Sequence, residues 1–123
     1  MQHADIILDT TAIAALRALQ VPGRTSIILR VVDLFERSTT SLMSELEQGL
    51  ERGDIGLVTR VAHTLKSSSA NIGATALAER AKIIEQSGRE GRLDDCRSAA
   101  EGLLALFNGT LAAVDALRRE EAA

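Results

Sequence analysis

A lone histidine in a helical stretch carries the clearest chemistry that this sequence offers. His63 opens the segment HTLKSSSANIG, residues 63–73. A solvent-exposed imidazole is largely neutral at pH 7 and keeps a nitrogen lone pair, so it needs no activating base to act as a nucleophile. Such a ring can accept a phosphoryl group and pass it on, provided that nothing bulky covers it.

The helical spacing around His63 predicts that the ring faces water. One residue turns an α-helix by about 100°, so His63 lies about 140° from Val58, where the apolar side chains gather. The neighbours on the His63 face are Thr59, Ser67 and Ala70, one or two turns away. These side chains are short, and we expect them to leave the ring accessible to a partner.

Two cations flank the ring in the same helix. Lys66, three residues after His63, can bring its ammonium beside the imidazole, and Arg60, three residues before it, lies on the other flank. Phosphoryl transfer depends mainly on positioning and charge stabilisation, and a mobile lysine charge can follow the group. Ser69 points to the core, where we expect its hydroxyl to bond the Leu65 carbonyl.

Apolar side chains recur at steps of three, four or seven and predict five helices, with no strand signal between them. Val21-Pro22-Gly23, Gly53 and Gly73 end helices, and we expect Gly88 and Gly91 to break the chain. The predicted helices are Asp9 (N-cap) to Leu19, Ser26 to Leu50, Ile55 to Ile72, Thr75 to Gln86, and Asp94 or Asp95 to Arg118. The fold class is therefore all-α, an antiparallel up-down four-helix bundle with a short additional N-terminal helix.

The ordered string from His63 to Gly73 resembles the signature H-x-L-K-G-[SA]-[SA]-x-x-x-G of histidine-containing phosphotransfer (Hpt) domains of bacterial phosphorelays. One position departs from the signature: the family usually has a glycine directly after the lysine, and this chain has Ser67 there. Serine is also small. The resemblance implies that His63 takes a phosphoryl group from an aspartyl phosphate on a receiver domain and delivers it to a second receiver aspartate. It also implies that Lys66 stabilises the phosphoryl group and that Leu65 packs inward.

The resemblance covers nearly the whole chain, so we expect one Hpt-like domain over residues 1–123, with a lead-in at 1–8 and a frayed tail at 120–123. We expect Thr59, Arg60, Ser67 and Ala70 to contact receiver domains of response regulators or hybrid kinases. The domain itself is expected to need no cofactor, since the receiver would supply Mg²⁺. It would be a phosphocarrier without an ATP-binding or hydrolytic site, because no glycine-rich phosphate loop occurs.

Composition argues against several other classes. The chain has 123 residues with 14 basic and 17 acidic side chains, a net charge of −3, and no Tyr or Trp. Nucleic-acid binding is therefore not expected. Apolar runs are too short for a membrane span, and the single cysteine, Cys96, fits a reducing cytoplasm. Metal binding is not expected, since Ser67 rather than a ligand stands one turn after His63 and His3 lies in the lead-in.

Two other functions remain open on the sequence alone. One is the phosphoacceptor and dimerisation region of a histidine kinase, although Thr64 and Leu65 follow His63 where such regions carry an acidic residue. The other is a helical interaction module that binds a partner without chemistry. We expect a monomer, either free-standing or as the C-terminal module of a hybrid sensor kinase.

Overall fold

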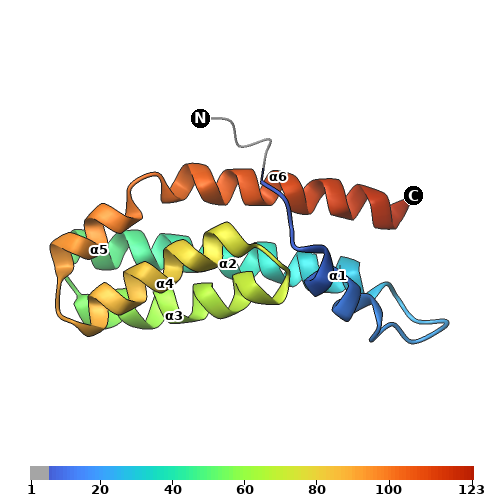
Figure 1. Ribbon diagram of the computed structural model, residues 1–123, viewed down its shortest axis with the longest axis horizontal. Helices are drawn as coiled ribbons and strands as arrows, with labels where there is room; N and C mark the ends of the chain where they lie inside the picture. The colour runs from blue at the N-terminus through green and yellow to red at the C-terminus, as the bar shows by residue number, and fades with distance from the viewer. Residues whose placement is uncertain (1–5) are drawn as a thin grey trace.

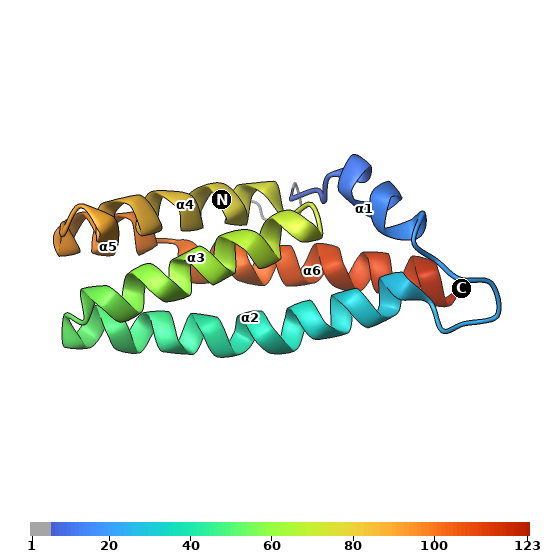
Figure 2. The ribbon, with the colours of Figure 1, turned by 90° about the horizontal axis from the view of Figure 1, so that it is seen from below.

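The computed structural model describes residues 6–123, which form six helices and no strand (Figures 1 and 2). The predicted all-α class is thereby confirmed. Residues 1–5 of the predicted lead-in, including His3, lie outside the described residues. The helices are α1 (Thr10–Arg17), α2 (Ile27–Arg52), α3 (Ile55–Asn71), α4 (Thr75–Arg89), α5 (Leu93–Ala100) and α6 (Leu103–Ala122).

The long helices lie side by side (Figures 1 and 2). Helix α3 packs against α2 and α4, and α6 runs along α2 and α4 from the other side. Short connections join α2 to α3 and α3 to α4, so consecutive long helices reverse direction. Helix α1 packs against α2 and lies at one end of the molecule.

Aliphatic side chains fill the space between the helices, as the low aromatic content predicts. Val58, Ala62 and Leu65 of α3 are fully buried, and the two phenylalanines, Phe35 and Phe107, are nearly so. Each fully buried Val, Leu or Phe side chain contributes roughly 1.5–3 kcal/mol relative to its exposed state. This apolar arc holds α3 in one rotation about its axis, with its polar face outward.

Polar side chains mark the helix starts near the predicted positions. Asp9, the predicted N-cap of α1, accepts a hydrogen bond from the backbone N–H of Thr11, and Asp54 does the same for Leu57 at the start of α3. Such caps satisfy N–H groups that have no partner within the helix. Gly53, at φ 71°, ends α2 in the left-handed region that glycine adopts without strain.

The prediction of one continuous final helix is wrong. It is split into α5 and α6, whose axes differ by 45° across Glu101 and Gly102. Gly102 has a φ of 74°, and Arg80 of α4 donates hydrogen bonds to the carbonyls of Ala99 and Glu101 at the break. These bonds satisfy backbone groups that a continuous helix would have paired internally.

The C-terminal end also differs from the expectation of a frayed tail, since α6 remains helical to Ala122. Glu121 in this segment pairs with Arg17 of α1 at 2.7 Å. In the described part of the chain, no single helix has both the length and the hydropathy to cross a membrane, and only the bent α5–α6 pair passes when joined.

The predicted break at Gly88 is also wrong, because α4 continues through this residue to Arg89. Gly88 is buried in the helix, next to Thr59 of α3. The glycine therefore allows close packing between two helices rather than ending one.

Candidate functional site

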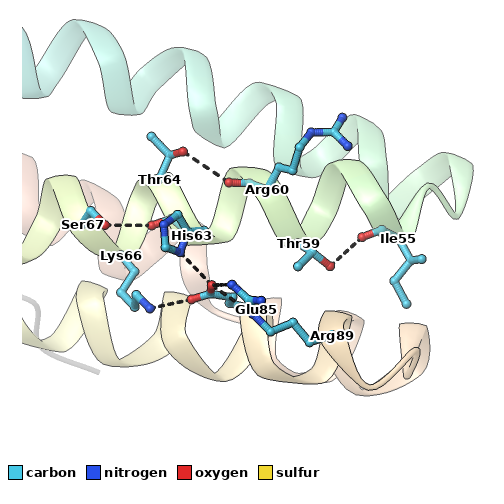
Figure 3. A network of polar contacts seen from close by, with 9 residues as sticks. All are labelled: Ile55, Thr59, Arg60, His63, Thr64, Lys66, Ser67, Glu85 and Arg89. Atoms are coloured by element: carbon cyan, nitrogen blue, oxygen red, sulfur yellow. Dashed lines mark hydrogen bonds and ion pairs between the residues drawn. The ribbon is translucent and has the colours of Figure 1, made fainter.

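His63 lies midway along α3 with its ring on the surface, as the helical spacing predicts (Figure 3). Its side chain is 55% exposed, whereas Val61, Ala62 and Leu65 around it in sequence are buried. The burial of these apolar neighbours sets the rotation of the helix. The ring is thus presented to solvent by the packing of the opposite face.

A carboxylate from α4 holds one nitrogen of this ring. His63 Nδ1 lies 2.7 Å from Oε2 of Glu85, whose side chain is only 5% exposed (Figure 3). An ionised carboxylate can only accept hydrogen bonds, so Nδ1 must carry the proton of this contact. In the neutral ring, Nε2 then carries the free lone pair.

Glu85 also binds two cations. Lys66 Nζ lies 2.7 Å from Oε1, and the Arg89 guanidinium donates to Oε2 at 2.6 and 3.2 Å. Burial alone would raise the pKa of the Glu85 carboxyl, but the hydrogen bonds from Lys66, Arg89 and His63 outweigh it and lower the pKa to about 2. Glu85 is therefore an anion at neutral pH, and its contact with Nδ1 is maintained.

The predicted partner-contacting residues do not all gather around the ring. Thr59 is half-buried, and its hydroxyl donates to a carbonyl one turn earlier at 2.7 Å. Arg60 is exposed and its guanidinium points away from His63 (Figure 3). Ser67 donates to the His63 carbonyl at 3.3 Å, and Ala70 is exposed further along α3. None of these four side chains covers the imidazole.

The expectation for Ser69 is half correct. Its side chain is fully buried, as predicted, but its Oγ has no hydrogen-bond partner among the described residues, so the predicted bond to the Leu65 carbonyl is wrong. The hydroxyl points into the packed interior. A small side chain at this position is what the helix packing requires.

A family model of the Hpt domain matches residues 30–120, from the first turn of α2 to the last turn of α6. The chain belongs to the Hpt domain family. No curated protein and no solved structure matches the chain. Hpt domains are phosphocarriers of phosphorelays rather than classical enzymes, and they interact with receiver domains.

Glu85 is the residue of this Hpt domain that the sequence analysis missed. A signal for it exists, because Glu85 follows Ala81 by four residues and Leu77 by eight, on the apolar stripe of α4. A carboxylate on a buried stripe requires a partner, and Arg89 stands four residues later. The predicted end of α4 at Gln86 hid this pairing.

A depression of about 330 Å³ opens beside His63 between α3 and α4. It is lined by His63, Lys66, Lys82, Glu85, Gln86, Arg89 and Glu90. Three of these side chains are cations and two are carboxylates, and Glu85 already pairs with Lys66 and Arg89, so the depression carries only a small excess of positive charge beside the ring. In residues 6–123, no group of three or more His, Cys, Asp or Glu side chains is arranged to hold a metal ion.

Proposed function

We propose that Nε2 of His63 accepts a phosphoryl group from the aspartyl phosphate of one receiver domain and passes it to the aspartate of another. The observation that supports this most directly is the ring itself. It is more than half exposed, and its other nitrogen is held by Glu85 at 2.7 Å. A neutral nucleophile with a protonated, anchored Nδ1 presents its lone pair outward.

In the proposed step, the Nε2 lone pair of His63 forms a bond to phosphorus, and the bond from phosphorus to the aspartate oxygen breaks. The bonding electrons leave with the receiver carboxylate. The ring becomes cationic while Nδ1 keeps its proton, and the Glu85 carboxylate stabilises this charge. Donation to the second receiver is the reverse of this sequence.

Lys66 is proposed to stabilise the phosphoryl group. Its ammonium is bound to Glu85 Oε1, and the flexible side chain can move to phosphoryl oxygens next to the ring. Arg89 would keep Glu85 paired when Lys66 moves, because it binds the other carboxylate oxygen. Mg²⁺ would come from the receiver, and the Hpt domain needs no cofactor of its own.

The receiver is proposed to dock over the exposed face of α3, on Thr59, Arg60, Ser67 and Ala70 around His63. Short side chains at Ser67 and Ala70 would let the receiver's phosphoaspartate approach the ring. Charged residues such as Arg60 at the rim would affect association rate and partner choice more than affinity. A relay must release its partners, so we expect a small interface.

For the whole chain, we propose an antiparallel up-down four-helix bundle of α2, α3, α4 and α6, with α1 covering one end. Residues 1–123 would form a single domain, a cytoplasmic monomer that binds neither nucleic acid nor membrane. The supporting observation is that α6 packs against both α2 and α4, which closes the arrangement within one chain.

The test is a transfer assay with a phosphorylated receiver domain and Mg²⁺. The wild-type protein should gain one acid-labile phosphoryl group, and His63→Gln should gain none while keeping its helical circular dichroism spectrum. Thr64→Ala, at the neighbouring exposed position of α3, is the matched control and should be phosphorylated normally. Phosphorylation of the His63→Gln variant to the wild-type level would contradict the proposal.

A further inference from the structure

Helices α3 and α4 approach each other unusually closely at one point. Gly88 of α4 is buried, and a Cβ added to it would lie 2.2 Å from Oγ1 and 3.2 Å from Cβ of Thr59. Carbon and oxygen atoms that are not bonded do not come this close. The spacing of the helices at this point therefore requires a residue without a side chain at position 88.

Thr59 cannot easily move out of the way. Its hydroxyl donates to the Ile55 carbonyl at 2.7 Å, which holds the side chain in its rotamer. We name the contact between Gly88 and Thr59 the α3–α4 notch. In it, the fixed side chain of Thr59 packs directly against the backbone of α4 at Gly88.

The α3–α4 notch lies one helical turn from the phosphoacceptor pair. His63 follows Thr59 by four residues on α3, and Glu85 precedes Gly88 by three on α4, so both lie next to the notch. The hydrogen bond between them spans the same two helices at 2.7 Å. Such bonds weaken steeply beyond about 3.2 Å, so a displacement of α4 by about 1 Å would break the contact.

We infer that Gly88 is a positioning residue, which through its contact with Thr59 brings Glu85 within hydrogen-bond distance of His63 Nδ1. The inference rests on the proposed function only for the consequence of this contact in phosphoryl transfer. It explains why a glycine, which destabilises a helix interior relative to alanine, stands inside α4. If Gly88 served helix packing alone, a small shift of α4 would be tolerated. The hydrogen bond between Glu85 and His63 would not survive such a shift.

The experiment compares Gly88→Ala with the wild type by NMR of the unphosphorylated protein. The wild type should give a slowly exchanging Nδ1 proton signal for His63 and ¹⁵N shifts of the Nδ1-protonated tautomer. Gly88→Ala should lose this signal and show a mixture of tautomers, and its transfer rate should fall roughly tenfold, the effect of one lost hydrogen bond.

A second substitution tests the steric cause. Thr59→Ala removes the oxygen that lies 2.2 Å from the new Cβ, so in the Gly88→Ala background it should restore most of the His63 signal. Gly56→Ala is the matched control, since its added Cβ would meet nothing closer than 3.6 Å and the spectrum of His63 should not change.

A folded Gly88→Ala variant with the wild-type Nδ1 signal would overturn the inference, and so would a double variant that does not recover it. If Gly88→Ala is too unstable for NMR, the double variant decides. A folded double variant with the wild-type Nδ1 signal supports the inference about Gly88. A double variant as unstable as Gly88→Ala refutes it. The tautomer of His63 is measured in the unphosphorylated protein. A failure of the proposed phosphoryl transfer would therefore leave this test of Gly88 unaffected.

Discussion

One buried carboxylate organises the polar face of α3 and α4. Glu85 accepts hydrogen bonds from His63, Lys66 and Arg89, so each of its oxygens has at least one charged or imidazole donor (Figure 3). Burying a carboxylate is costly unless it is paired, and these three contacts offset that cost. The same contacts hold the imidazole in one orientation and one tautomer, so stability and reactivity depend on the same residue.

Glu85→Gln tests this dependence. The glutamine amide keeps the shape of the Glu85 side chain but has only one acceptor oxygen. Its NH₂ group would face the hydrogen-bond donors of His63, Lys66 or Arg89. We expect the transfer rate to fall by roughly tenfold and the free energy of unfolding by about 1–3 kcal/mol. Transfer kinetics and urea denaturation measure the two effects.

Glu90→Gln is the control for this change. Glu90 lines the same depression but is exposed and pairs with Arg92 at 3.5 Å, so its substitution should alter neither quantity by much. Equal rates for Glu85→Gln and Glu90→Gln would show that the carboxylate contact with Nδ1 has no part in transfer.

Among the elements, the N-terminal segment is held at the C-terminal end of α3. Gly73 has a φ of 76°, and its carbonyl accepts a hydrogen bond from the Asp9 N–H at 2.8 Å. A Cβ at Gly73 would lie 2.7 Å from that nitrogen. The last residue of the histidine motif thus ends α3 and also leaves space for the segment that leads into α1.

Gly73→Ala should therefore disturb α1 more than the ring of His63. The substitution adds the strain of a left-handed alanine, about 1–2 kcal/mol, to a clash with backbone that cannot rotate away. We expect a loss of about 2–3 kcal/mol in the free energy of unfolding and faster amide exchange in residues 8–17. Gly91→Ala is the control for the strain alone, since φ is 73° there and nothing lies within 4 Å. An equal loss in the two variants would mean that the Asp9 contact contributes nothing.

The apolar spacing of α3 was enough to predict that His63 faces solvent, because burial of Val58 and Leu65 sets the helix rotation. The N-cap at Asp9 was also predicted from the sequence, because an Asp that accepts a backbone N–H at the start of a helix is a local signal. The two glycines Gly88 and Gly102 could not be told apart in this way. Gly88 lies inside α4, whereas Gly102 is the N-cap of α6 at the break after α5. The difference comes from contacts with Thr59 and Arg80, which are distant in sequence.

At the scale of the molecule, ion pairs tie the ends of the helices together. Arg118 of α6 pairs with Glu36 of α2 at 2.9 Å and with Asp33 at 3.1 Å. Arg17 of α1 pairs with Glu121 of α6. The side chains of these pairs are 20–61% exposed, so each pair contributes about 1 kcal/mol or less. Glu85 is only 5% exposed, and its cluster is therefore the polar group that matters most for stability.

Stability should therefore depend on pH through Glu85. Its pKa is lowered from 4.5 to about 2, so the folded state favours the ionised form. A lowered folded-state pKa stabilises the protein above the unfolded value and loses this contribution as the pH falls through the folded value. The difference in unfolding free energy between the wild type and Glu85→Gln should be largest above about pH 5 and should shrink by about 3 kcal/mol towards pH 2. Urea denaturation at several pH values measures it, and a difference that does not change with pH would contradict this.

The site of phosphorylation tests the central claim most directly. The protein, labelled with ¹⁵N in its histidines, is phosphorylated by a phosphorylated receiver domain, and the imidazole nitrogens of His63 are observed by NMR. We predict a phosphoryl group on Nε2, seen by its coupling to ³¹P, and a retained proton on Nδ1 next to Glu85. A phosphoryl group on Nδ1, or none on His63, would contradict the account.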